Sequence, residues 1–151
     1  MTGNAKRRVS INKSKILIRN SHPLLKPPVT NRYVKSAINR VMLGEKTRLD
    51  ALYINLVDKK RVKQINKKFL KHDYFTDIIT FPYEVTKSGL SAEIFMCLDV
   101  IKENSAIYKV SYSNEFMRVL IHGCLHLAGY GDKSGKEKEL IRSKENFYLS
   151  E

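Results

Sequence analysis

One segment, residues 122–132, limits what this chain of 151 residues can fold into more than any other. It reads HGCLHLAGYGD, and the helix predicted to run into it is apolar on nearly every side. The apolar residues of that helix are Phe116, Val119, Leu120, Ile121, Cys124, Leu125 and Leu127. Such a helix has to be buried, and two buried imidazoles need polar partners. We therefore predict a fold built around this helix, with its histidines enclosed.

The two histidines are placed to share one metal ion. His122 and His126 are four residues apart, so on a helix they project from the same face about one turn apart. Gly129 lets the chain leave the helix and turn back. Asp132, six residues after His126, can then supply a third ligand while a fourth position stays open to water. Three ligands and an open position indicate a catalytic metal site rather than a structural one.

A histidine pair at this spacing is by itself weak evidence for a metal. Interior histidines are often satisfied by hydrogen bonds, and surface histidines are solvated. Here the apolar flanks, the glycine at the helix exit and Asp132 favour coordination. Cys124 lies two residues from each histidine and points to another face of the helix, so we interpret it as a buried thiol.

The charge of the chain predicts a polyanionic partner. Lys and Arg number 28 against 15 Asp and Glu, a net charge of +13. Small soluble domains typically carry a net charge of magnitude ~2–8. The excess favours nucleic acid, and an anionic membrane surface is a weaker alternative. Two cysteines form no disulfide framework and no run of ~20 apolar residues occurs, so we expect a cytoplasmic protein with no membrane partner.

Helical and strand-like patterns alternate along one domain. We predict a basic flexible arm over residues 1–15 and a single domain over residues 16–151. Strands are predicted at residues 16–19, 49–57, 77–81 and 93–98. Helices are predicted after the N-cap Thr30, after the N-cap Asp58, and at about residues 99–109, 113–127 and 136–149. In the second helix Val62, Ile65 and Phe69 are predicted to face inward.

The segment HGCLHLAGYGD resembles the signature of the YbeY family of bacterial rRNA maturation endoribonucleases, in which a helix carrying HGxLHLxGYDH binds zinc. Residues 65–66 and 73–84 (DYFTDIITFPYE) are similar to a second family block, and Ala92-Glu93-Ile94 falls where the family has Gly-Asp-Ile. Glu115 matches a family glutamate before the histidines. The resemblance implies an α+β fold in which a mixed sheet of about four strands packs against helices, with the metal-binding helix central and buried.

The third ligand departs from the family pattern. The chain has Asp132 where the resemblance implies histidine, and Gly131 where it implies aspartate. Lys133 cannot replace the ligand, because a protonated ammonium has no lone pair to donate. We expect one divalent ion per chain, with zinc as the expected metal. A carboxylate in place of an imidazole also makes Mn²⁺ and Fe²⁺ better tolerated.

A residue in the predicted loop also departs from the family pattern. The resemblance implies an active-site arginine at the position of Leu70, and a leucine cannot bind phosphate. Lys71 and His72 stand beside it and are candidate catalytic residues for charge stabilisation or proton transfer, although each is equally compatible with an exposed loop side chain.

Arg118 is the third candidate catalytic residue, one turn before His122. It can contact phosphate, pair with Glu115, or support the metal ligands. Gly123 follows the first histidine where a metalloprotease of the HExxH type needs glutamate, which argues against that mechanism. Phosphodiester hydrolysis instead asks for an activated water, cationic charge near the phosphate and a basic groove.

Together the motifs predict a single-strand-specific, metal-dependent endoribonuclease that acts in rRNA maturation and ribosome quality control and uses a metal-activated water. Its predicted partners are rRNA and, by the resemblance alone, the small ribosomal subunit. The alternative is an RNA-binding ribosome-assembly factor with a structural metal and little or no cleavage. A metal-dependent hydrolase of another substrate also stays open.

Overall fold

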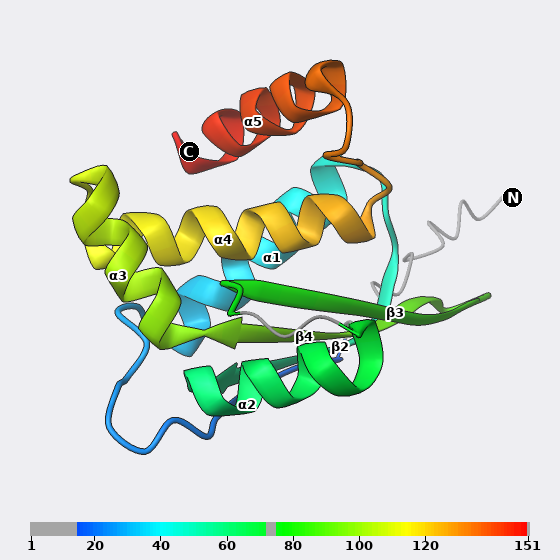
Figure 1. Ribbon diagram of the computed structural model, residues 1–151. Coiled ribbons are helices and arrows are strands. Elements are labelled where there is room, and N and C mark those ends of the chain that lie inside the picture. The colour runs from blue at the N-terminus through cyan, green and yellow to red at the C-terminus, as the bar shows by residue number, and fades with distance from the viewer. Residues whose placement is uncertain (1–14, 72–74, 151) are drawn as a thin grey trace, which may run out of the picture.

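A mixed four-stranded sheet forms the centre of the molecule. The structure is a computed structural model and describes residues 15–71 and 75–150. The strands are β1 (Lys15–Asn20), β2 (Leu49–Val57), β3 (Ile78–Thr86) and β4 (Gly89–Cys97), in the order β1-β2-β4-β3 (Figure 1). β1 and β4 run parallel to β2, whereas β3 pairs antiparallel with β4 at the sheet edge.

Alternation along the strands assigns a separate apolar cluster to each face of the sheet. One face carries the larger cluster, which includes Leu52, Ile54 and Leu56 of β2 and Ala92, Ile94 and Met96 of β4. The opposite face carries a smaller cluster with Val57, Ile79 and Cys97. Because successive side chains of a strand point to opposite faces, both faces of this sheet need helices to cover them.

Helices cover both clusters. α4 (Tyr112–Leu127) lies over the sheet with α1 (Asn31–Gly44) beside it, and α5 (Gly135–Leu149) forms an outer layer above α4 (Figure 1). α2 (Lys59–Ile65), continued by one π-helical turn η1 (Asn66–Leu70), packs on the opposite face. α3 (Leu98–Tyr108) follows β4 directly.

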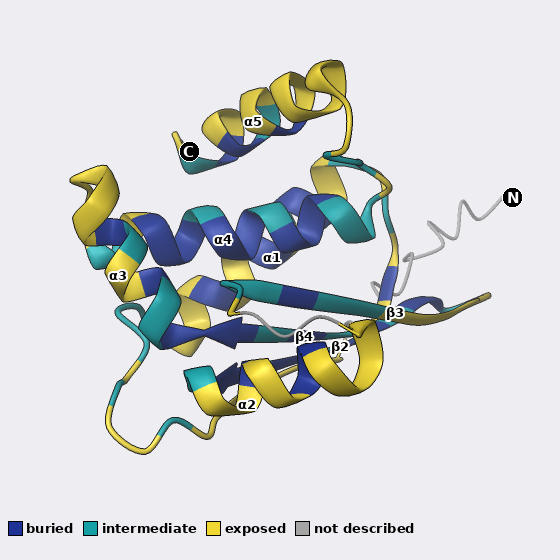
Figure 2. Cartoon of the chain, viewed as in Figure 1, coloured by how far each residue is buried: buried dark blue, intermediate teal, exposed yellow. Residues whose placement is uncertain are grey.

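α4 is the buried helix that the apolar pattern predicts. Phe116, Leu120, Leu125 and other side chains of α4 are almost completely enclosed, and the helix is buried along most of its length (Figure 2). Gly123 permits the close approach to β3, because a Cβ atom there would lie 2.5 Å from Cδ1 of Ile78. The α+β class, the four-stranded mixed sheet and the central helix are confirmed.

Local capping starts the helices where the sequence predicts. The Thr30 side chain accepts a hydrogen bond from the Tyr33 amide, and Asp58 accepts one from the Arg61 amide. Ser134 and Glu137 form a capping box at the start of α5, so that helix begins directly after the segment 122–132.

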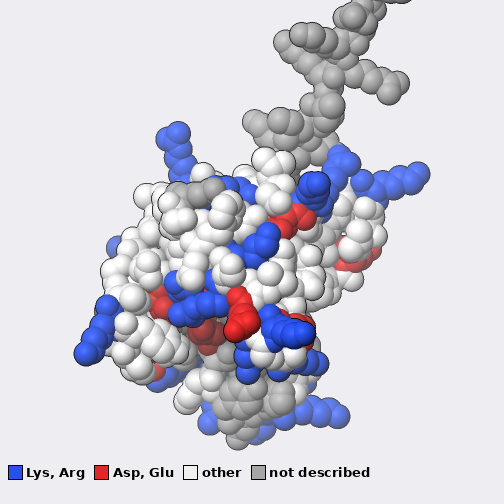
Figure 3. Space-filling view, turned by 90° about the horizontal axis from the view of Figure 1, so that it is seen from above, with Lys and Arg blue, Asp and Glu red and all other residues white. Residues whose placement is uncertain are grey.

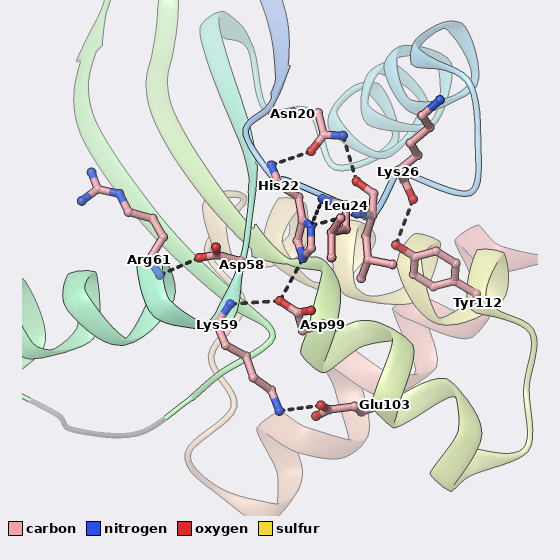
Figure 4. Close-up of polar contacts among 11 residues, drawn as sticks. Asn20, His22, Leu24, Lys26, Asp58, Lys59, Arg61, Asp99, Glu103 and Tyr112 are labelled. Atoms are coloured by element: carbon pink, nitrogen blue, oxygen red, sulfur yellow. Dashed lines mark hydrogen bonds and ion pairs between the residues drawn. The ribbon is translucent and has the colours of Figure 1, made fainter.

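The nearly buried side chain of His22 links the connection before α1 to α2 and α3. His22 Nδ1 accepts from the amides of Leu24 and Leu25, so its Nε2 carries the proton and donates to Asp99 Oδ2 at 3.0 Å (Figure 4). The same Asp99 oxygen accepts from the Lys59 amide at 3.0 Å. These contacts hold the connection before α1 against the first turns of α2 and α3.

The structure corrects two details. Phe69 was predicted to face inward with Val62 and Ile65, but it is 59% exposed and Asn66 is buried instead. The π-helical turn adds residues per turn and so changes which side chain faces the sheet. The strands β3 and β4 also extend further than predicted, because Pro82 lies on an edge strand, where a missing N–H is tolerated.

The predicted arm falls outside the described residues, apart from Lys15, which is the first residue of β1. None of the helices in the described ranges is long and apolar enough to cross a membrane.

The close contact at Gly123 yields a stability prediction. Gly123→Val should lower the free energy of unfolding by about 1–3 kcal/mol, because the added methyl groups overpack the contact between α4 and β3. Gly135→Val is the matched control, since a Cβ atom at Gly135 meets nothing within 4 Å. Urea unfolding of both variants checks the prediction, and equal effects would contradict it.

Candidate metal centre

The end of α4 turns the chain back towards its own histidines. The Gly129 amide donates to the His126 carbonyl and the Tyr130 amide to the Leu125 carbonyl, each at 3.0 Å. This is a Schellman motif, and Gly129 adopts the positive φ of 108° that the motif requires. The turn therefore brings Asp132 beside the histidines, as the sequence predicts.

Three ligand atoms converge at this turn. His122 Nε2 and His126 Nε2 are 2.9 Å apart, and Asp132 Oδ2 lies 3.2 Å from His126 Nε2 and 3.6 Å from His122 Nε2. Ligands about 2.0–2.1 Å from a tetrahedral zinc ion lie roughly 3.3 Å from one another. The spacing of the three atoms therefore matches one small divalent cation.

The outer nitrogen of each ring fixes its tautomer. His126 Nδ1 lies 2.8 Å from the Tyr130 carbonyl oxygen, which can only accept, so the proton sits on Nδ1. His122 Nδ1 lies 3.0 Å from Glu145 Oε2, which accepts in the same way when ionised. Both Nε2 atoms are then left with lone pairs directed at each other and at the Asp132 carboxylate.

When both rings are neutral, two lone pairs and a carboxylate face one another with no donor among them, and this arrangement fits a cation. Carbonyl and carboxylate partners on the outer nitrogens are the arrangement that orients histidine ligands in metal sites. Burial opposes protonation of the His122 ring, but the hydrogen bond and charge of Glu145 outweigh it and raise the pKa of His122. The surroundings of the pair therefore favour positive charge.

Glu145 is held ionised by its neighbours. It is almost fully buried on α5, yet Arg118 Nη1 lies 3.2 Å from its Oε1 while His122 lies against its Oε2. Burial would raise the pKa of Glu145, but the hydrogen bonds and charges of His122 and Arg118 lower it. Arg118 also donates to Asn146 Oδ1 at 3.0 Å, so its contacts run to α5 rather than to Glu115.

Two pockets meet at the ligands. A pocket of about 760 Å³ lies between α4 and α5, and its walls include Arg118, Arg142 and Asp77. A second, of about 670 Å³, lies against β3 and η1 and includes Asn66 and Leu70. His122 and Asp132 line both pockets, as does Asp77, whose pKa is raised by burial. The candidate site is therefore accessible from two sides, through His122 and Asp132.

The predicted catalytic residues have different positions. Arg118 lines the first pocket but is engaged with Glu145 and Asn146. Lys71 directly follows η1, has an exposed side chain and is not among the residues that line either pocket. His72 lies outside the described residues. Leu70 lines the second pocket, which places the departure from the family arginine beside the metal ligands.

Sequence reasoning missed Glu145 and the Tyr130 carbonyl. A signal for Glu145 exists, because the buried residues of α5 are Ile141, Glu145 and Tyr148 at helical spacing. An acidic residue on the apolar stripe of a charged helix indicates a buried partner. A backbone carbonyl carries no such signal.

The contact between Glu145 and His122 yields a prediction for metal affinity. Glu145→Gln should weaken binding of zinc by about 10–100-fold, because the amide cannot hold the His122 tautomer as the carboxylate does. Asn146→Ala removes the neighbouring contact to Arg118 and serves as the matched control, with a smaller expected loss. Competition with a chromophoric chelator measures both affinities, and an unchanged affinity in Glu145→Gln would contradict the assignment.

Comparisons with known proteins agree along most of the chain. Residues 19–151 match the family model described as Endoribonuclease YbeY. A protein of Cytophaga hutchinsonii named Endoribonuclease YbeY is 38% identical over 117 residues, which cover 78% of this chain and 82% of that protein. Its counterpart in Parabacteroides distasonis is 36% identical over 128 residues, covering 85% of this chain and 87% of that one.

A solved structure supports the fold. The solution structure of TM1509 from Thermotoga maritima matches with a TM-score of 0.62 and 27% sequence identity, covering 89% of this chain and 85% of that one. The family-model match extends through the segment that carries both histidines and the turn to Asp132. This chain therefore belongs to the YbeY family of endoribonucleases.

Proposed function

We propose that this chain is a metal-dependent endoribonuclease that cleaves single-stranded RNA in rRNA maturation and ribosome quality control. One zinc ion per chain is held by His122, His126 and Asp132. The substrate is rRNA, presented by the small ribosomal subunit in the cytoplasm. Relatives named Endoribonuclease YbeY support the reaction class.

The observation that carries the proposal is the convergence of three acceptors on one point. The Tyr130 carbonyl and Glu145 fix the protons on the outer nitrogens of the two rings, so both inner nitrogens face Asp132 as lone pairs. A structural metal would be enclosed by four protein ligands. Among the described residues, the candidate set contains three ligands, each partly exposed.

The residues around the ligands fit a phosphodiester substrate. When bound, the metal supplies Lewis-acid stabilisation of charge and lowers the pKa of water. Arg142 and Lys138 line the first pocket and Lys133 lines the second, so cations flank the ligands on both sides. Asp77 lies on the wall of both pockets, and its pKa, raised by burial, suits it to hold a proton near the reacting phosphate.

Arg118 acts through another residue in this proposal. Its guanidinium holds Glu145, which orients His122, and Arg118 is also one of the residues that line the first pocket. Lys71 and His72, which follow η1 in the sequence, remain candidates for phosphate contact and proton transfer. Gly123 leaves the position after the first histidine without a general base, which argues against peptide hydrolysis.

One observation favours the assembly-factor alternative. Leu70 lines the pocket beside the metal ligands, where the family resemblance implies an arginine. A leucine there supplies no positive charge to a bound phosphate, whereas the lysines elsewhere on the surface can still bind RNA. Under this alternative the chain binds rRNA and its metal but cleaves weakly or not at all.

Removal of a ligand separates the two functions. Metal content and cleavage of a single-stranded rRNA fragment should both be lost in His126→Ala and Asp132→Ala, with cleavage reduced by about 10²-fold or more. Asp50→Ala, an exposed acidic residue on β2, is the matched control. Elemental analysis, circular dichroism and a cleavage assay with and without chelator provide the measurements. Wild-type protein that holds metal and binds RNA but leaves it intact would establish the assembly factor.

The leucine at position 70 yields a prediction of its own. Leu70→Arg should raise the cleavage rate by about tenfold or more, because the guanidinium adds positive charge to the pocket that contains His122 and His126. Leu43→Arg adds the same charge at an exposed position on α1 and is the matched control. Single-turnover cleavage rates compare the two variants, and an equal effect of both would show that only net charge matters.

A further inference from the structure

The segment that forms α2 and η1 carries basic side chains and no acidic ones. Residues 59–71 include seven Lys or Arg and no Asp or Glu. By contrast, α5 contains four basic and three acidic residues, and the side of the molecule that carries α5 shows both signs interspersed (Figure 3). We call α2, η1, Lys71 and Phe75 the α2 face. Its charge is complementary to a polyanion, while that of α5 is mixed.

Two phenylalanines are exposed among these lysines. Phe69 is 59% exposed and Phe75 is 47% exposed, although neither has a polar atom to hydrate. Lys68 Nζ lies 5.2 Å from the centre of the Phe69 ring, and Lys59 and Lys63 place theirs 5.3 Å and 5.5 Å from the Phe75 ring. Aromatic rings set between lysines are the arrangement by which proteins bind single-stranded nucleic acid.

The π-helical turn is what exposes Phe69. In a continuous α-helix Phe69 would follow Val62 and Ile65 onto the sheet, but the turn buries Asn66 there and leaves Phe69 at the margin. This ring packs against Phe81 in a T-shaped arrangement with 5.7 Å between centroids, and Phe81 packs on Phe95 in the same way at 5.9 Å. Phe69 is therefore held in place from one side while more than half of its surface stays open.

The same turn joins the α2 face to the metal centre. Asn66 and Leu70 belong to η1 and line the pocket that also contains His122, His126 and Asp132. Phe69 lies between them in the sequence and is directed to the outer surface. A strand that follows the α2 face past η1 therefore arrives at the metal ligands.

We propose that the α2 face binds a single-stranded segment of RNA next to the cleavage site, with bases stacked on Phe69 and Phe75 and phosphates held by the surrounding lysines. This inference rests on the proposed function for its substrate. The occupant is single-stranded because a duplex buries the faces of its bases, which the two rings need.

In this proposal a lysine lies over an aromatic ring when RNA is absent and beside a phosphate when RNA is bound. Lys68 and Lys63 interact with the rings in the absence of RNA, and a base that stacks on a ring displaces the ammonium group towards the neighbouring phosphate. Lys59 is also paired with Glu103 (Figure 4), and the Asp58 cap fixes the helix start beside it. The start of α2 is thus anchored, while the lysines further along the helix are the ones that adjust to the strand.

The absence of tryptophan from the chain permits a direct optical test. Phe69→Trp and Phe75→Trp each introduce a single tryptophan on the α2 face, and Phe147→Trp places one at a similarly exposed position of α5. With chelator present to prevent cleavage, a single-stranded 12-nucleotide RNA should quench the tryptophan fluorescence of Phe69→Trp and Phe75→Trp and leave that of Phe147→Trp unchanged. A duplex of the same sequence should quench the fluorescence of none of the three variants. Equal quenching of all three variants, or of none, would overturn the proposal.

Affinity measurements with the same RNA complete the test. Phe69→Ala and Phe75→Ala should each weaken binding of the single strand by about 5- to 150-fold, whereas Phe147→Ala should not. Phe75→Leu keeps an apolar side chain and should also lose affinity, because stacking is removed. Lys67→Ala should reduce the salt dependence of binding relative to Lys136→Ala. Alanine variants that bind like the Phe147→Ala control would overturn stacking on the α2 face.

Two kinds of failure are distinguishable, because binding is measured in chelator and cleavage without it. If wild-type protein binds the strand through Phe69 and Phe75 but does not cleave it, the proposed binding face stands and the proposed enzyme activity is wrong. If wild-type protein cleaves RNA and the phenylalanine variants bind and cleave normally, the proposed enzyme activity stands and the proposed binding face is wrong.

Discussion

The orientation of two imidazole rings on a buried helix is the constraint on which the rest of the structure depends. Carbonyl and carboxylate acceptors outside the rings hold the protons on the outer nitrogens, so the inner nitrogens of His122 and His126 face Asp132 without a donor between them. Lone pairs this close repel unless a cation lies between them. The turn after α4, the packing of α5 and the ion pair of Arg118 all serve to keep this arrangement in place.

The layers of the fold explain how such a polar cluster is accommodated next to a core. α4 packs on the sheet through Gly123, while its histidines lie on the side where α5 and the edge strand β3 leave two pockets. Glu145 reaches the cluster from α5, and η1 reaches it from the other face of the sheet around β3. Elements from both faces therefore meet at the ligands, and this is what connects the basic α2 face to the metal centre.

Sequence patterns predict the elements that depend on local interactions. The bounds of β2, the caps Thr30 and Asp58 and the proximity of His122, His126 and Asp132 follow from alternation, side-chain capping and spacing on one helix, and the structure agrees with each. The missed features depend on contacts between distant segments. Glu145 contacts His122 across 23 positions of sequence, and the exposure of Phe69 depends on a π-helical turn that apolar periodicity does not reveal.

The central claim is that two imidazole nitrogens and one carboxylate oxygen bind a single divalent ion. X-ray absorption spectroscopy of the zinc-loaded protein tests it most directly, because it separates nitrogen and oxygen ligands from sulfur and recognises imidazole rings. The account predicts two imidazole ligands, the remaining ligands oxygen, and no sulfur, since Cys124 is buried on another face of α4. A sulfur ligand, or a coordination sphere without imidazole, would contradict it.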